Sequence, residues 1–145
     1  MIARDPFVLA APRGHALATA AEPARAAALS GASVLVLEDG HCFRDQALAF
    51  CARARAREGE FRATSLPTLA QMVASGAGVT LLPELAVATE AQRAGLRVRS
   101  FVEPAPHRTI GLVWRRGYPL AEALRKIAAT IRAAYPRGDR QSAAH

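Results

Sequence analysis

The sequence predicts an α/β fold built on a largely parallel sheet. Short apolar runs bounded by turn residues alternate with stretches of helical periodicity, which is the order of elements in such folds. Residues 34–37 are apolar at every position, as expected of a parallel strand that is buried on both faces. The chain has 145 residues, which is the length of one ordinary domain with one core.

The first half of the chain contains three predicted strands and two helical stretches. A strand over 7–11 is followed by an Ala-rich stretch, 16–30, that is predicted as a short helix or ordered loop. The buried strand over 34–37 ends at a turn that leads into a helix from Cys42 to about Glu58. A short strand over 61–63 closes this half.

The second half begins with a helix over 66–75, for which Ser65 is a good N-cap. The remaining elements are, in order, a strand over 79–82, a short helix over 84–94, a strand over 96–101, a strand over 109–114 and a last helix over 120–135. The polar residues 137–145 are predicted to be disordered.

The net charge of +7 raises the question of nucleic-acid binding, since 19 side chains are basic. All of these except Lys126 are arginines, and they are scattered rather than gathered in a block with interleaved aromatic residues. A solvated basic surface is the preferred interpretation. No apolar run reaches the roughly 20 residues that span a bilayer, and residues 1–6 lack the apolar core of a signal peptide. A cytoplasmic protein without a membrane partner is therefore expected.

Cys42 stands where a buried strand turns into a helix. Free backbone N–H groups and the positive end of the helix dipole face such a position, and His41 and Arg44 add positive charge. Each of these favours the thiolate, which is the form that attacks peroxide. Arg44 can also donate hydrogen bonds to a peroxide oxygen. The same residues leave open the alternative of a buried, inert cysteine.

Cys51 follows nine residues later in the same predicted helix. A helix rises 1.5 Å and turns 100° per residue, so the two Cα atoms would lie about 13 Å apart and on opposite faces. A disulfide requires Cα atoms within about 7 Å of each other. The pair cannot be joined while the helix is intact, and a disulfide would require a second backbone conformation, as a redox switch does.

Other kinds of site are not indicated. The histidines at 15, 41, 107 and 145 lack the spacing of a zinc site, and no metal or cofactor is predicted. The glycines at 76 and 78 are more simply explained as a helix stop than as a phosphate loop.

Five stretches resemble the OxyR family, the hydrogen-peroxide-sensing members of the LysR-type transcriptional regulators. They are 37–47, Phe50-Cys51, 61–66, 78–83 and 108–113. The segment 78–83 is typical of LysR-type effector domains in general. The block Gly40-His41-Cys42-x-Arg44-Asp45-Gln46, with a second cysteine nine residues after the first, is highly specific.

The resemblance implies roles for individual residues. Cys42 would be the peroxide-reacting cysteine, and Cys51 would be the resolving cysteine that forms a redox-active disulfide with it. The peroxide pocket would be lined by His41, Arg44, Asp45 and Arg108.

The resemblance also implies a periplasmic-binding-protein-like fold of type II, in which two α/β subdomains are joined by two crossing strands. Residues 1–10 would be a crossing strand from a partial first subdomain, and 11–106 the complete, redox-sensing second subdomain. Residues 107–136 would be the returning strand and helix of the first subdomain. The winged helix-turn-helix of the family has no counterpart in this sequence.

Partners follow from the same resemblance. Hydrogen peroxide, a glutaredoxin- or thioredoxin-type reductant and a homodimer or homotetramer of the full-length protein are implied, with promoter DNA bound only through the missing N-terminal domain. An activator of oxidative-stress genes, and not an enzyme, is predicted. Two alternatives stay open: a LysR-type domain that binds a small metabolite, and a thiol peroxidase that turns over with thioredoxin.

Overall fold

A computed structural model describes residues 1–135 of the chain. They group into two compact units: one is Asp5–Arg108, and the other combines Met1–Arg4 with the chain from Thr109 onward. The roles predicted for 1–10, 11–106 and 107–136 remain predictions. The tail predicted to be disordered, 137–145, lies outside the described residues.

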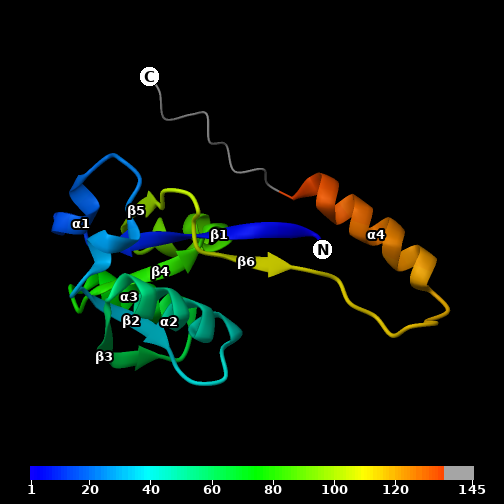
Figure 1. Ribbon diagram of the computed structural model, residues 1–145, viewed down its shortest axis with the longest axis horizontal. Helices are drawn as coiled ribbons and strands as arrows, with labels where there is room; N and C mark the ends of the chain where they lie inside the picture. The colour runs from blue at the N-terminus through cyan, green and yellow to red at the C-terminus, as the bar shows by residue number, and fades with distance from the viewer. Residues whose placement is uncertain (136–145) are drawn as a thin grey trace. The chain divides into compact units, whose positions relative to one another are not determined.

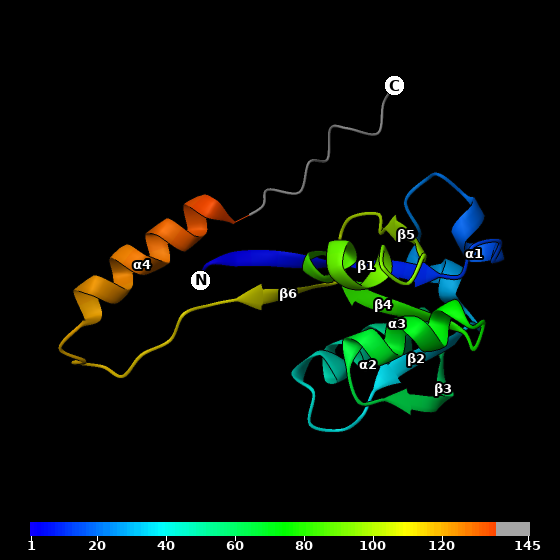
Figure 2. The ribbon, with the colours of Figure 1, turned by 180° about the vertical axis from the view of Figure 1, so that it is seen from behind.

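The larger unit is built on a sheet whose strands lie in the order β3-β2-β4-β1-β5 (Figure 1). The strands are β1 Ala3–Ala11, β2 Ser33–Leu37, β3 Arg57–Ala63, β4 Val79–Pro83, β5 Arg97–Ser100 and β6 His107–Ile110. Strand β2 runs parallel to β3 and to β4, whereas β1 runs antiparallel to β4 and to β5. Strand β6 lies beside β1 (Figure 2). The sheet is therefore mixed.

The prediction of a largely parallel sheet is wrong for β1. Strands β2, β3 and β4 are joined by helical crossovers, which is how parallel neighbours have to be connected. Strand β1 lies between two strands that come later in the chain, so no crossover fixes its direction. Its register places Leu9 beside Leu81 of β4 and Arg99 of β5, and Phe7–Ala11 are all buried.

Three helices occupy connections between these strands: α1 Ala16–Thr19, α2 Cys42–Ala54 and α3 Leu66–Ala74. A fourth, α4 Ala121–Ala134, follows β6. The predicted cap of α3 is confirmed, because Ser65 Oγ accepts a hydrogen bond from the Thr68 N–H at 3.3 Å. The segment predicted as a short helix over 84–94 forms a 3₁₀ turn, Glu84–Ala86, and a π-helical turn, Val87–Ala91. A further 3₁₀ turn covers Ala26–Leu29.

Helix α2 ends at Ala54, before the predicted end near Glu58. The reason is local: Arg55 has a left-handed φ of 56°, and its N–H closes the last turn of the helix on the Ala52 carbonyl. The chain is then redirected into β3, which begins at Arg57 and is longer than the predicted strand over 61–63. Glu58 consequently lies on a strand and not at the end of a helix.

The core of the larger unit fastens α2 to the sheet at two places. The ring of Phe43, in the first turn, packs edge-on against Phe7 of β1, with the ring centroids 4.9 Å apart. The ring of Phe50 packs in the same manner against Phe101, just beyond β5, at 5.0 Å. Such contacts add about 0.5–1.5 kcal/mol each to the burial of the rings. The helix that carries both cysteines is thus anchored near both of them.

Strands β2 and β3 approach each other closely at Gly59. A Cβ atom built on Gly59 would lie 2.6 Å from Leu35 Cδ2, a distance that packed atoms do not tolerate. The pairing of β3 with β2 is also irregular here, since Val34 is opposite Glu58 but Val36 is opposite Arg62. This bulge lies between Glu58 and Arg62.

The smaller unit contains helix α4 and the end of β6. The predicted strand over 109–114 is wrong in its bounds, because β6 ends at Ile110, whose carbonyl accepts the Ile2 N–H at 2.7 Å. Strand β1 begins one residue later, at Ala3, so β6 has no strand to pair with beyond this point in the described part of the chain. Ile127 and Ile131 of α4 are exposed. No helix among the described residues is long and apolar enough to cross a bilayer.

Candidate redox site

The first turn of α2 presents Cys42 to solvent. Strand β2 ends at Leu37, Gly40 takes a positive φ of 93°, and His41 is the residue that precedes the helix. The N–H of Arg44 closes the first turn on the His41 carbonyl at 2.9 Å. Cys42 is exposed and is not in a disulfide. The predicted placement of Cys42 at a helix N-terminus is confirmed, and the helix dipole favours negative charge there.

Cys51 lies in the same helix and faces the core. Its thiol is free, and the residue is 3% exposed. Burial raises the pKa of Cys51 from 9.0 to about 11; a backbone hydrogen bond lowers it somewhat, and the nearby Glu58 carboxylate adds to the rise. At neutral pH only about one molecule in 10⁴ carries a Cys51 thiolate. Cys51 is therefore a poor nucleophile while α2 is in place.

The continuity of α2 keeps the two cysteines apart. Both belong to the helix Cys42–Ala54, so the helical rise separates their Cα atoms by about 13 Å along the axis. Their different exposure agrees with opposite faces of the helix. A disulfide needs roughly half that separation. The predicted need for a change of backbone conformation follows from this arrangement.

Arg44 is buried and points to two carboxylates. Its Nη2 donates to Glu58 Oε1 at 2.9 Å, and its Nε lies 3.3 Å from Asp39 Oδ1. Its side chain is 9% exposed. These two carboxylates neutralise much of the positive charge of Arg44, which was predicted to stabilise the Cys42 thiolate. Its place in a peroxide pocket stays a prediction, as do those of half-buried His41 and exposed Asp45.

Arg108 pairs with an acid that the sequence analysis did not select. Arg108 Nε donates to Asp5 Oδ2 at 2.8 Å, and Asp5 is 1% exposed. The second oxygen of Asp5 accepts the N–H of Leu85 at 3.2 Å. The signal that the sequence offered is a carboxylate two residues before the apolar run 7–11.

The position of this ion pair relative to α2 follows from the spacing of Asp5 and Phe7 on β1. Asp5 and Phe7 are two residues apart on β1, so their side chains leave the same face of the sheet. Phe7 packs on Phe43, the residue after Cys42. The structure therefore brings Asp5 and Arg108 to the face of β1 that the first turn of α2 covers.

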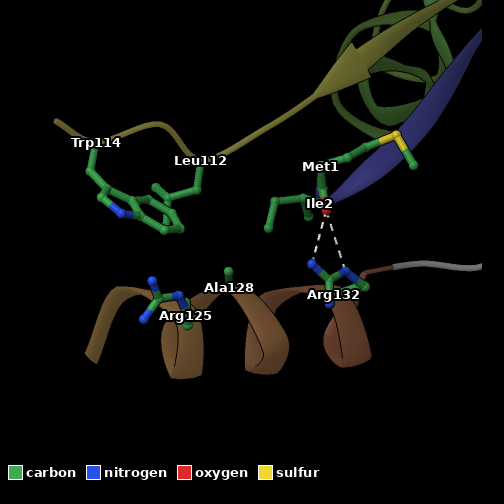
Figure 3. Close-up of a pocket in the computed structure, with 7 residues that line it drawn as sticks. All are labelled: Met1, Ile2, Leu112, Trp114, Arg125, Ala128 and Arg132. Carbon is green, nitrogen blue, oxygen red and sulfur yellow. Dashed lines mark hydrogen bonds between the residues drawn. The ribbon is translucent and has the colours of Figure 1, made fainter. Parts of the chain in front are cut away.

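The smaller unit has a pocket of its own, which the sequence analysis did not predict. Trp114 and Leu112 lie across from α4, and Ile2, Arg125 and Ala128 complete most of the lining (Figure 3). Arg132 closes one end by donating two hydrogen bonds to the Met1 carbonyl, at 3.0 and 3.3 Å. This pocket contains neither cysteine. Among the described residues, no cluster of three or more histidine, cysteine or acidic side chains could hold a metal ion.

Comparison with known proteins identifies the class of domain to which this fold and helix belong. The model of the LysR substrate binding domain family matches residues 1–136, so the chain belongs to that family. The predicted periplasmic-binding-protein-like fold of type II is confirmed.

Curated relatives of the chain include OxyR and hydrogen peroxide-inducible genes activators. The DNA-binding transcriptional dual regulator OxyR of Escherichia coli K12 is 49% identical over 130 residues, which are 89% of this chain and 42% of that protein. The hydrogen peroxide-inducible genes activator of Pectobacterium carotovorum subsp. carotovorum is 52% identical over 105 residues, 72% of this chain and 35% of that protein. The predicted resemblance is confirmed. The chain spans less than half the length of these relatives.

Two solved structures represent two redox forms. The crystal structure of the reduced form of OxyR matches with a TM-score of 0.78 and 45% identity, over 91% of this chain and 61% of the solved one. The oxidised form matches with a TM-score of 0.74 and 48% identity, over 91% of this chain and 62% of the solved one. Both forms are therefore similar to this chain in fold.

Proposed function

We propose that this chain is the peroxide-sensing part of a LysR-type transcriptional regulator and that it switches by forming a Cys42–Cys51 disulfide. One observation carries the proposal: a single helix holds an exposed cysteine at its N-terminus and a buried, protonated cysteine on the opposite face. The similarity to hydrogen peroxide-inducible activators supports peroxide as the signal.

The reaction proceeds in two steps. The Cys42 thiolate attacks one oxygen of hydrogen peroxide, an S–O bond forms, the O–O bond breaks, and the leaving hydroxide takes up a proton to become water. The Cys51 thiolate then attacks the sulfur of the Cys42 sulfenic acid, an S–S bond forms, the S–O bond breaks, and the leaving hydroxide takes up a proton to become a second water. Two thiols are oxidised, and one peroxide is reduced to two waters.

The larger unit, Asp5–Arg108, is the redox-sensing subdomain in this proposal, and the chain from Thr109 belongs with the first subdomain. His41, Asp45, Arg44 and Arg108 line the peroxide pocket. A segment of the full-length protein outside this chain binds promoter DNA as a dimer or tetramer. A glutaredoxin- or thioredoxin-type protein reduces the disulfide and resets the switch.

Limiting peroxide with a sulfenate-trapping reagent tests the order of the two steps. Because Cys42 is exposed and Cys51 is buried, the Cys51→Ser variant should trap one sulfenate, at Cys42. The matched Cys42→Ser variant should react far more slowly. Faster labelling of Cys51 in that control would reverse the two roles.

The number of peroxides consumed separates a sensor from a peroxidase. A sensor should consume one peroxide per disulfide and then stop when no reductant is present, and with thioredoxin in excess it should continue only as fast as the slow reduction of the disulfide. Continuous consumption at the rate of the first step would contradict the proposal and favour a thiol peroxidase.

A further inference from the structure

Four charged side chains form a compact cluster around the beginning of α2. Glu58 Oε1 accepts hydrogen bonds from Arg44 Nη2 at 2.9 Å and from Arg62 Nε at 3.0 Å. Asp39 completes the cluster, because its two carboxylate oxygens lie 3.3 Å from Arg44 Nε and 3.6 Å from Arg62 Nη1. Each of the two carboxylates thus contacts both arginines, and each arginine contacts both carboxylates.

The cluster joins three segments that surround Cys42. Asp39 lies in the turn before α2, Arg44 lies in the first turn of the helix, and Glu58 and Arg62 belong to β3. In a regular strand, residues four apart are about 13 Å apart. The bulge in β3 between Val34 and Val36 of its partner strand lies between Glu58 and Arg62 and allows one carboxylate oxygen to hold both arginines.

Glu58 is the member on which the cluster depends. The side chain of Arg44 is 9% exposed, and that of Glu58 is 32% exposed, whereas Asp39 is 81% exposed. An ion pair between largely exposed side chains contributes little, and a charge that is largely buried has to be paired. Glu58 is thus the carboxylate that holds Arg44, and with it the first turn of α2, in place.

Formation of the disulfide has to disturb this arrangement. Cys42 and Cys51 cannot meet while the residues between them are helical, and Arg44 is one of those residues. The same carboxylate contributes to the raised pKa of the Cys51 thiol. Glu58 therefore opposes the attack of Cys51 in two ways. It holds the first turn of α2 in place through Arg44, and its negative charge disfavours the Cys51 thiolate.

We propose that Glu58 is a positioning residue that delays the second step of the switch, by holding Arg44 and the first turn of α2 until Cys51 is released. This assignment rests on the proposed function for its biological meaning, but it concerns only the joining of the two sulfurs. Glu58 bears on the attack of Cys42 only through the charge of Arg44. Its removal should therefore accelerate disulfide closure more than the first step.

The two steps can be timed separately with dithionitrobenzoate and the full chain. The exposed Cys42 thiolate attacks the reagent and releases one thionitrobenzoate, which leaves a mixed disulfide on Cys42. Cys51 then attacks that sulfur and releases the second thionitrobenzoate. The rate of the second release measures closure without peroxide, so the assignment of Glu58 is tested even if peroxide is not the signal.

The variant is Glu58→Gln, which keeps the shape and removes the charge. Loss of the charge frees Arg44 and lets the first turn of α2 open more often, whereas it removes only the smallest of the contributions to the Cys51 pKa. We expect closure about threefold faster than in the wild type, the size of effect of one partly exposed ion pair, and a first release within twofold.

Two controls make the result specific. Glu60→Gln removes an exposed carboxylate from the same strand and should leave both steps unchanged. Glu58→Asp keeps the charge and should close at nearly the wild-type rate. Unchanged closure in Glu58→Gln, or equal acceleration by Glu60→Gln, would overturn the assignment. Equal acceleration of both releases would overturn it as well, because that result describes a general loosening of α2. Failure of the wild type to react with peroxide would overturn only the proposed function.

Discussion

Oxidation of the chain should unwind α2 between its two cysteines. The perturbation is the disulfide itself: a separation of about 13 Å along the axis has to shrink to below about 7 Å. Helices bend too gently to achieve this within nine residues, so backbone hydrogen bonds between the cysteines have to break. The hydrogen bonds of α2 are present in the reduced form, since the helix runs unbroken from Cys42 to Ala54.

The free energy that opposes this change can be worked out from what α2 buries. Phe43 and Phe50 are each 6% exposed, and uncovering such a side chain costs about 1.5–3 kcal/mol. Each lost backbone hydrogen bond adds about 1 kcal/mol. The two phenylalanines alone represent about 3–6 kcal/mol, which corresponds to about 60–130 mV in the reduction potential of the disulfide. The disulfide should therefore be more oxidising than a structural one and open to reduction by cellular thiols.

Hydrogen exchange measured amide by amide on reduced and oxidised protein tests the reasoning. Protection should fall for residues 44–50 on oxidation and stay unchanged in α3, which contains no cysteine. The Cys51→Ser variant treated with peroxide is the control, because it cannot form the disulfide and should keep its protection. Equal protection of 44–50 in both forms, with the disulfide verified by mass spectrometry, would refute the argument.

Three further predictions concern stability and can be checked by denaturant unfolding. The pKa of Cys51 rises from 9.0 to about 11 on folding. The folded state then binds more protons than the unfolded state between these pH values, so the free energy of unfolding should fall by about 2–3 kcal/mol as pH rises through this window. The Cys51→Ala variant should lack that part of the fall. If the free energy of unfolding fell equally with pH in the variant and in the wild type, the prediction would be contradicted. Asp5→Asn leaves the Arg108 guanidinium without its buried partner and should cost about 3 kcal/mol; a change below about 0.5 kcal/mol would mean that the pair contributes nothing. Gly59→Ala should cost about 1–3 kcal/mol because its methyl group would overlap the core, whereas Gly111→Ala, with open space around it, should be nearly neutral. Equal costs for the two glycine variants would show that the close approach of β2 and β3 is not under strain.

Local signals in the sequence were sufficient for much of the fold. The apolar runs 34–37 and 79–82 became β2 and β4, which are buried on both faces, and Ser65 caps α3 because the cap needs only the next three residues. The position of Cys42 at the start of α2 depends likewise on neighbours in the chain. Such features could be predicted because their causes lie within a few residues of one another.

The charged partners at the site could not be predicted in this way. Asp5 and Arg108 are separated by 103 residues and meet only because β6 returns beside β1. Glu58 reaches Arg44 only because Arg55 ends the helix early and β3 carries a bulge. Both pairings depend on which strands become neighbours and on where a bulge falls, and hydrophobic periodicity specifies neither. The two arginines stay predicted pocket residues, and the carboxylates that hold them were not selected from the sequence.

The separation of the two cysteines by one helix also separates the two chemical steps in time. In the proposed switch, peroxide would reach Cys42 without any movement of the backbone, because that residue is exposed in the first turn. Cys51 stays protonated and buried until Phe50 and Arg44 leave their sites, so opening of the helix limits closure. An opening of the protein does not depend on how much oxidant is present. In this proposal the first step would respond to the concentration of peroxide, and the second would set the lifetime of the Cys42 sulfenic acid, during which cellular thiols could still reverse it. A brief exposure to peroxide would be erased during that interval, and only a sustained one would convert most of the protein to the disulfide.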